Sequence, residues 1–218
     1  MTSVALRSIT EDAEMHCIEI ARVSSTRDNK RSQPYRLVRY LITNKHWSPF
    51  EHAYMTLEIV TSRVIAAQLL RHRSFTFQEL SQRYQDVRNV FGEAELFMPI
   101  QLRWKGKTNR QSSHGECLDS KLHHRIKKHM SQTIVLYNDL LEAGIAKECA
   151  RMILPLNTKT RVYMTGNIRS WIHFIQARLY DGAQAEIQII AKGAKTIFMA
   201  QCPLFSKALN WVEPIKTL

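Results

Sequence analysis

The segment from residue 71 to residue 84, RHRSFTFQELSQRY, carries a dense set of charged and hydrogen-bonding side chains. In order, these are Arg71, His72, Arg73, Gln78, Glu79, Ser81, Gln82 and Arg83. The forked guanidinium group suits phosphate and carboxylate oxygens, and an amide beside a carboxylate suits the edge of a heterocycle. The segment therefore predicts binding of anionic ligands that carry a heterocycle. A simpler interpretation stays open, in which arginines near a helix end complement its free carbonyl groups and its dipole.

The sequence favours one way of binding a phosphate over another. The seven glycines form neither GxGxxG nor GxxxxGK, so side chains rather than a backbone loop are expected to bind it. If residues 63 to 73 are helical, Arg71, His72 and Arg73 spread over about 200° of the helix, whereas Gln68 shares a face with Arg71. One small ligand cannot contact all three, which predicts two ligands, or a large cofactor with a substrate.

A second informative stretch is NIRSWIHFIQARLYDGAQAE, residues 167 to 186. Trp171, Phe174, Ile175 and Arg178 recur at helical spacing, which places Arg178 on the apolar face. A guanidinium turned toward an apolar face needs a partner. Two partners stay open at this point: Glu186 in a salt bridge, or a ligand in a dry pocket.

Other chemistries find less support. Neither HExxH nor another metal-binding spacing joins the histidines, and GxSxG is absent, so no metal site and no α/β-hydrolase is expected. The four cysteines have no CxxC pair, which favours free thiols in a reducing cytosol. Cys17 and Cys149 are expected in the core, Cys117 in a variable loop, and Cys202 in apolar surroundings at a helix end.

Length and net charge limit the number of domains and the class of binding partner. The 218 residues, 44% of them hydrophobic, are enough for a single domain, residues 1–218. A net charge of +12 favours anionic partners, either nucleic acid or several phosphorylated or carboxylated small molecules. The N-terminus does not resemble a signal peptide, and no apolar run is long enough for a membrane span, so a soluble protein of the cytoplasm is expected.

Periodicity and turn residues predict a mixed α/β fold with helices around a modest sheet. Strands are expected at residues 3–10, 53–60 and 160–165, and a long polar loop at 101–115. The expected helices run from Thr10 to about Val23, over 34–45, from Arg63 to about His72, over 118–142, before Pro155, from Asn167 to about Leu179, over 183–200 and over 204–212.

At these residues the chain resembles the flavin-dependent thymidylate synthases, the ThyX family. RHRSFTFQELSQRY matches the RHR-x7-S signature of that family. The resemblance continues through ARVSS (21–25), HWSPFEH (46–52), AAQLLRHR (66–73), KECARMILPLNTKTRVYMTGNIRSWIHFIQAR (147–178) and QAEIQ (184–188). Only residues 92 to 135 lack clear landmarks of the family.

The resemblance implies an activity and a set of ligands. It implies a methyltransferase that converts dUMP to dTMP, with 5,10-methylenetetrahydrofolate as the carbon donor and tetrahydrofolate as a product. FAD, reduced by NADPH, supplies the hydride. It also implies a homotetramer whose subunits share the active sites, in the cytoplasm of the cell or of the host of a virus or phage.

The resemblance also assigns residues. Positions that match FAD contacts are Ser48, Arg71, His72, Arg73, Glu79, Asn167, Arg169 and His173. Positions that match dUMP contacts are Gln68, Arg71, Glu79, Leu80, Ser81, Gln82, Arg83, Arg151 and Arg178. Arg178 corresponds to the arginine that favours negative charge on the uracil ring, the catalytic role expected here, and His46 to a histidine beside flavin and folate.

Two positions depart from the common pattern, and one class of function competes. Gln82 stands where glycine is common, and His173 stands where asparagine is common. Ser81 lacks an adjacent base and is interpreted as a dUMP ligand, not as a nucleophile.

The competing hypothesis is a basic nucleic-acid-binding module without catalysis, to which the basic run 103–128 would contribute. In the enzyme interpretation this run is a solvated face, and no nucleic-acid partner is expected.

Overall fold

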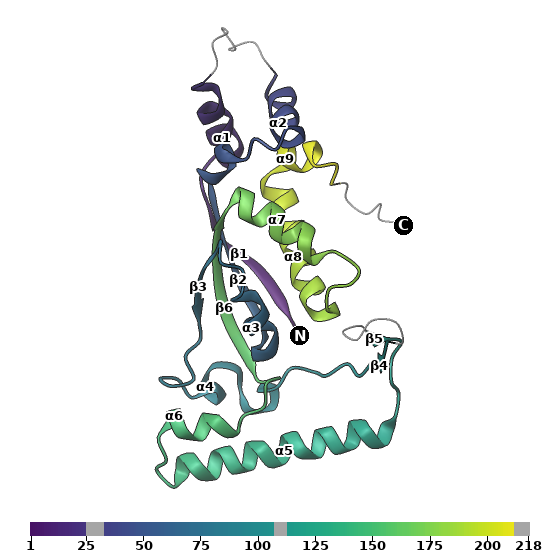
Figure 1. Ribbon diagram of the computed structural model, residues 1–218. Helices are drawn as coiled ribbons and strands as arrows, with labels where there is room; N and C mark the ends of the chain where they lie inside the picture. Colours follow the sequence, from purple (N-terminus) through teal and green to yellow (C-terminus); the bar gives the residue numbers. More distant parts are fainter. Residues whose placement is uncertain (25–32, 107–112, 212–218) are drawn as a thin grey trace. The chain divides into compact units, whose positions relative to one another are not determined.

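The computed structural model describes residues 1–24, 33–106 and 113–211 (Figure 1). Some sequence predictions extend beyond them: Ser25 of ARVSS, residues 107–112 of the polar loop and of the basic run 103–128, residue 212 at the end of the last expected helix, and parts of the expected domain 1–218. The described part combines helices with a small sheet, which confirms the mixed α/β class. None of the described helices combines the length and apolar character needed to cross a membrane.

The main sheet has four strands in the order β1 (Ser3–Ile9), β2 (Tyr54–Ser62), β6 (Lys159–Asn167) and β3 (Thr76–Glu79). In β2 and β6 buried residues alternate with partly exposed ones, as expected for strands with one face toward a core. The three strands predicted from sequence are confirmed. β3 lies inside the 71–84 segment and was missed, because four residues of mixed polarity carry too little periodic signal.

Internal contacts divide the described residues into two compact units. The first contains Met1–Thr2, Val60–Arg71 and Gln78–Val162, and the second contains Ser3–Ile59, His72–Phe77 and Tyr163–Leu218. The unit boundaries fall within β2, β3 and β6, and between Arg71 and His72. The single domain expected from length stays a prediction.

The first unit is built on the long helix α5 (Ser120–Glu142), drawn in teal in Figure 1. The carboxylate of Asp119 accepts hydrogen bonds from the backbone N–H groups of Lys121 and Leu122 and so begins this helix. Its apolar core joins Val87, Leu96, Tyr137 and Ala150. The other elements of this unit are α3 (Arg63–Leu69), α4 (Val87–Phe91), the 3-10 helices η3 (Glu93–Glu95) and η4 (Arg151–Ile153), β4 (Trp104–Lys105), β5 (Ser113–His114) and α6 (Lys147–Ala150).

The second unit has an aromatic core. Trp171 and Phe174 of α7 (Ile168–Arg178) are buried, as are Phe50 and Phe205, whose rings meet edge to face. Helix α7 and helix α8 (Ala185–Gln201) lie side by side (Figure 1). Its other helices are α1 (Ala13–Arg22), α2 (Pro34–Thr43), the 3-10 helix η2 (Ser48–Glu51) and α9 (Pro203–Ala208).

Several predicted boundaries need correction. Helix α1 begins after Asp12, not at Thr10, because the Thr10 hydroxyl accepts a hydrogen bond from the backbone N–H of Tyr54. Helix α3 ends at Leu69, since the chain must turn between residues 71 and 75 to enter β3. Helix α9 ends at Ala208, and Asn210 after it has a positive φ of 56°.

The loop expected at 101–115 contains the short β4–β5 ladder. The start of α7 at Asn167 is confirmed, with its side chain accepting from Ser170 N.

Candidate active site

The predicted ligand-binding residues are distributed over both units. The first unit holds Gln68, Arg71, Glu79, Leu80, Ser81, Gln82, Arg83 and Arg151. The second unit holds His46, Ser48, His72, Arg73, Asn167, Arg169, His173 and Arg178. Because α3 ends before residue 70, Arg71, His72 and Arg73 lie in a turn, and the helical fan expected for them is wrong.

Arg178 and His72, both in the second unit, are in direct contact. Helix α7 ends at Arg178, and its Nε donates a hydrogen bond to Nε2 of His72 at 2.9 Å. The contact that the described residues give for Arg178 is thus an imidazole rather than the Glu186 carboxylate, and a ligand as partner of Arg178 stays a prediction. Burial, and then the Arg178 charge, lower the pKa of His72. Both effects favour the neutral ring that can accept this bond.

The imidazole of His72 is held by aromatic neighbours. Its ring meets Phe174 edge to face at 5.0 Å, and Phe75 lies 6.3 Å away. Phe75 in turn packs on Trp171 at 4.8 Å. A Cβ on Gly166 would lie 2.5 Å from the Phe75 ring, so any larger residue would force that ring to shift. Phe75 and Gly166 therefore support the site, although neither has a side chain that sequence reasoning would single out as chemical.

The two remaining cations of the turn are available to a ligand. Arg71 and Arg73 are exposed. Within the described part of the chain neither makes an ion pair, unlike Arg63, Arg83, Arg88 and Arg169. Exposed guanidinium groups of this kind fit phosphate oxygens.

Glu79 ends β3 in the first unit with its carboxylate already oriented. Its Oε1 lies 3.2 Å from Arg63 Nη1 and accepts a hydrogen bond from Thr160 Oγ1 at 2.9 Å. Sequence reasoning missed Arg63 and Thr160, because both stand far from Glu79 in the chain. Thr160 meets Glu79 through the pairing of β6 with β3, and Arg63 reaches it from the start of α3.

The segment after β3 presents the rest of the signature. The backbone N–H of Leu80 donates to Arg161 O, which extends the pairing with β6. Ser81 O accepts from the N–H groups of Tyr84 and Gln85, which forms a turn. Arg83 Nε lies 2.8 Å from Glu148 Oε2. Gln82 is buried, and its Nε2 finds no hydrogen-bond partner among the described residues.

Four of the residues predicted to contact a flavin, Ser48, Asn167, Arg169 and His173, belong to η2, the N-cap of α7 and α7 itself, all in the second unit. Ser48 begins η2, and the Trp47 ring before it meets His173 edge to face at 4.9 Å. Arg169 pairs with Glu51 at the end of η2. Burial, and then Arg169, lower the pKa of His173. His46 is exposed, with its ring edge-on to Tyr40 at 5.7 Å.

The cysteines give one correction. All four are free thiols, and burial raises the pKa of Cys17 to about 12 and also raises that of Cys202. Cys17 lies in the core, as predicted. The core position expected for Cys149 is wrong, because this residue faces solvent in the short helix α6.

The family to which the chain belongs is established by comparison. The sequence pattern of the family described as thymidylate synthase complementing protein, Thy1, matches residues 5–204. The chain therefore belongs to this family, that of the flavin-dependent thymidylate synthases, and it is an enzyme.

Named relatives agree with the family. The chain is 49% identical over 183 residues to a probable flavin-dependent thymidylate synthase of Paramecium bursaria Chlorella virus 1, covering 81% of this chain and 80% of the relative. It is 44% identical over 200 residues to the flavin-dependent thymidylate synthase of Synechocystis, with coverage of 88% and 86%. Among solved structures, a UMP/dUMP methylase, PolB of Streptomyces cacaoi, bound with 5-Br dUMP, is similar with a TM-score of 0.83 and 27% identity, covering 98% of each chain.

Proposed function

We propose that this enzyme converts dUMP to dTMP by reductive methylation, with 5,10-methylenetetrahydrofolate as carbon donor, NADPH as reductant and tetrahydrofolate as a product. The observation that carries the proposal is the contact between Arg178 and His72. Among the described residues, the partner found for the guanidinium is a neutral ring rather than a carboxylate, so this contact does not neutralise its positive charge. A uracil ring that gains electron density would be stabilised by such a preorganised cation.

The residues of the second unit fit FAD. Arg73 supplies unpaired donors for a pyrophosphate, and Ser48, Arg169 and His173 supply hydrogen-bonding groups around one short helix. Asn167 uses its carbonyl oxygen to cap α7, which leaves its amide N–H groups for a ligand. Bound FAD would supply the hydride. The protein's part is to hold the flavin and to shield it from water.

The residues of the first unit fit a nucleotide. Arg71, Arg83 and Arg151 present guanidinium groups suited to a phosphate, while Gln68, Glu79 and Ser81 offer groups suited to the sugar and base. The 5-Br dUMP held by the Streptomyces methylase supports dUMP as the substrate. Glu79 would act through the orientation that Arg63 and Thr160 impose on its carboxylate.

We further propose a homotetramer with active sites shared between subunits, working in the cytoplasm. The predicted ligand residues extend over segments at 46–48, 68–83, 151 and 167–178, more than one face of any single helix can present to one ligand. Four free thiols fit a reducing compartment. Light scattering of the purified protein should give the mass of a tetramer, and a fully active monomer would contradict the shared site.

The activity is tested by spectroscopy and turnover. The purified protein should be yellow, with flavin bands that dUMP perturbs, and it should form dTMP only with dUMP, methylenetetrahydrofolate and NADPH all present. A colourless protein whose main property is salt-dependent binding of DNA would favour the nucleic-acid module instead.

A further inference from the structure

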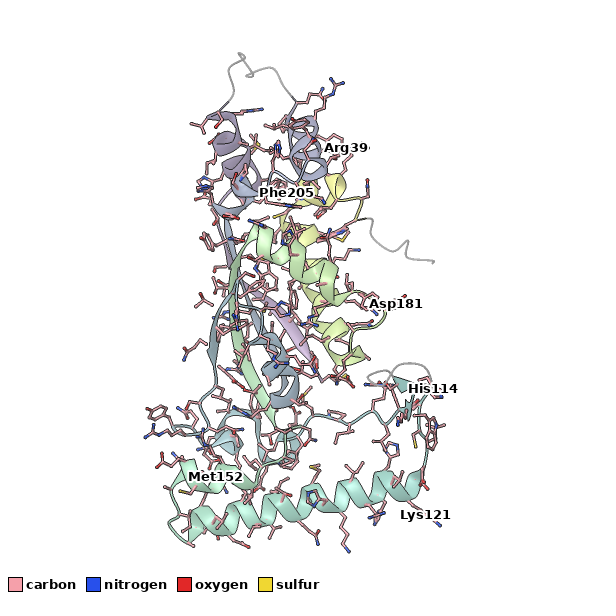
Figure 2. The ribbon with its side chains drawn as sticks, viewed as in Figure 1. Arg39, His114, Lys121, Met152, Asp181 and Phe205 are labelled. Atoms are coloured by element: carbon pink, nitrogen blue, oxygen red, sulfur yellow. The ribbon has the colours of Figure 1, made fainter. Side chains whose placement is uncertain are left out.

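The contact between Arg83 and Glu148 leads to an inference about how the nucleotide is bound. This inference rests on the proposed function. Glu148 lies in α6, and its Oε2 approaches Arg83 Nε to 2.8 Å. The backbone carbonyl of the same residue accepts a hydrogen bond from Arg151 Nε at 3.3 Å. Glu148 is thus the shared neighbour of two arginines that are proposed to bind dUMP. Figure 2 labels Met152, the residue after Arg151 in η4.

We propose that the Glu148 carboxylate holds Arg83 in the place of the nucleotide phosphate and gives it up when dUMP binds, so that Glu148 competes with the phosphate and sets the affinity for the nucleotide. A carboxylate and a phosphate present similar oxygens to a guanidinium fork, so the two compete for the same donors. The phosphate carries more charge, and Arg151 lies beside it to share that charge. A ligand without a phosphate has nothing to offer Arg83 in exchange for Glu148.

The ion pair between Arg83 and Glu148 is weak enough for a phosphate to replace the carboxylate. The side chains of Arg83 and Glu148 are 58% and 50% exposed, and ion pairs of such exposure contribute little free energy. Removing the carboxylate should therefore tighten dUMP binding by about two- to fivefold, the range that an exposed pair represents.

The loop that carries Arg83 has a second attachment to α6. Lys147 Nζ donates a hydrogen bond to the backbone carbonyl of Tyr84 at 3.3 Å. The guanidinium of Arg83 also lies 5.7 Å from the centre of the Tyr84 ring. Loss of the Glu148 charge should consequently release the Arg83 side chain without detaching the loop.

The experiment compares Glu148→Gln with the matched control Glu142→Gln, which removes one exposed negative charge from the end of α5 in the same unit. Calorimetric titration of the flavin-loaded proteins with dUMP should show about two- to fivefold tighter binding for Glu148→Gln and no change for Glu142→Gln. Inorganic phosphate, used as a competitor of dUMP, should inhibit Glu148→Gln at lower concentration than the parent. Binding of deoxyuridine should be equal in all three proteins.

The outcomes separate this inference from the function on which it rests. If the parent forms dTMP and Glu148→Gln binds dUMP equally or more weakly, Glu148 serves to orient Arg83 and the inference is wrong. If the parent neither binds dUMP nor forms dTMP, the proposed function itself fails. Glu148→Ala provides a second variant with the same expected direction, and thermal melting verifies that each variant is folded.

Discussion

Arg178 Nε lies 2.9 Å from Nε2 of His72, two residues separated by more than a hundred positions in the chain. The geometry requires that Nε2 of His72 carries a lone pair, which puts the proton of the neutral ring on Nδ1. His72 thereby orients the proposed catalytic guanidinium without lowering its charge. The second residue of the RHR signature is thus tied to the last residue of α7.

This contact predicts a loss of activity at acidic pH. The pKa of His72 lies below its usual value of 6.5, so the folded state favours the neutral ring. Its contribution to stability is present above 6.5 and is lost as the pH falls through the lowered pKa, where the protonated ring can no longer accept from Arg178. Rates of dTMP formation should fall in that window. His72→Gln keeps an acceptor but does not titrate, so its acidic limb should flatten.

The matched control for this pH profile is His173→Gln, because the pKa of His173 is lowered too. Its acidic limb should keep the shape of the parent's, whatever happens to its absolute rate. An unchanged acidic limb in His72→Gln would show that another group is responsible.

Arg178→Lys keeps a positive charge but loses the fork and the Nε donor. The substitution should cost about 2 to 4 kcal/mol of transition-state stabilisation, comparable to the loss of a preorganised donor to a developing anion. Single-turnover formation of dTMP measures this loss, while the bound flavin should be retained. Arg39→Lys, an exposed change in α2 labelled in Figure 2, is the control and should behave as the parent. If Arg178→Ala formed dTMP at nearly the rate of the parent, Arg178 would not have the proposed catalytic role.

The sequence indicated the position of helix α7 better than the partners of the candidate side chains. Apolar spacing predicted Arg178 on the apolar face of α7, and Asn167 was recognisable as its N-cap. The His72 contact could not be predicted, since a helix was expected where the chain turns after Leu69. Thr160 reaches Glu79 through strand pairing and Arg63 reaches it from the start of α3, and single-sequence periodicity reports neither contact. Local patterns thus predicted elements, and long-range pairing determined which side chains meet.

Gly166→Ala should disturb the site through the core. The added methyl would lie 2.5 Å from the ring of Phe75, which is buried between β6 and α7 and lies beside His72. Overpacking of this kind typically costs about 1 to 3 kcal/mol. The melting temperature should fall by about 2 to 4 °C per kcal/mol for a chain of this length. A variant that melts with the parent would show that Phe75 moves aside at no cost.

Gln82→Met tests the unpartnered amide. Gln82 is 5% exposed, and its Nε2 makes no hydrogen bond to the residues that the structure describes. An unsatisfied buried donor costs about 1 to 3 kcal/mol, so the similarly sized methionine should raise the melting temperature of the ligand-free protein. If the proposed dUMP contact satisfies Nε2, saturating dUMP should stabilise the parent more than Gln82→Met. Equal stabilisation by dUMP would exclude a ligand contact at this amide.

The last prediction concerns an alternative mechanism in which a cysteine thiolate attacks the pyrimidine. Burial raises the pKa of Cys17 to about 12 and also raises that of Cys202, so neither thiol ionises readily near neutral pH. Cys117 is buried as well, and Cys149 is exposed. Each Cys→Ala variant that retains bound FAD should form dTMP at a rate within about tenfold of the parent, a difference below about 1.4 kcal/mol. The variants at buried positions should melt at lower temperature, because the substitution leaves a cavity, whereas Cys149→Ala should melt with the parent. Mass spectrometry of quenched reactions should find no adduct between cysteine and uracil, and a folded, flavin-loaded Cys→Ala variant without activity would require a protein nucleophile after all.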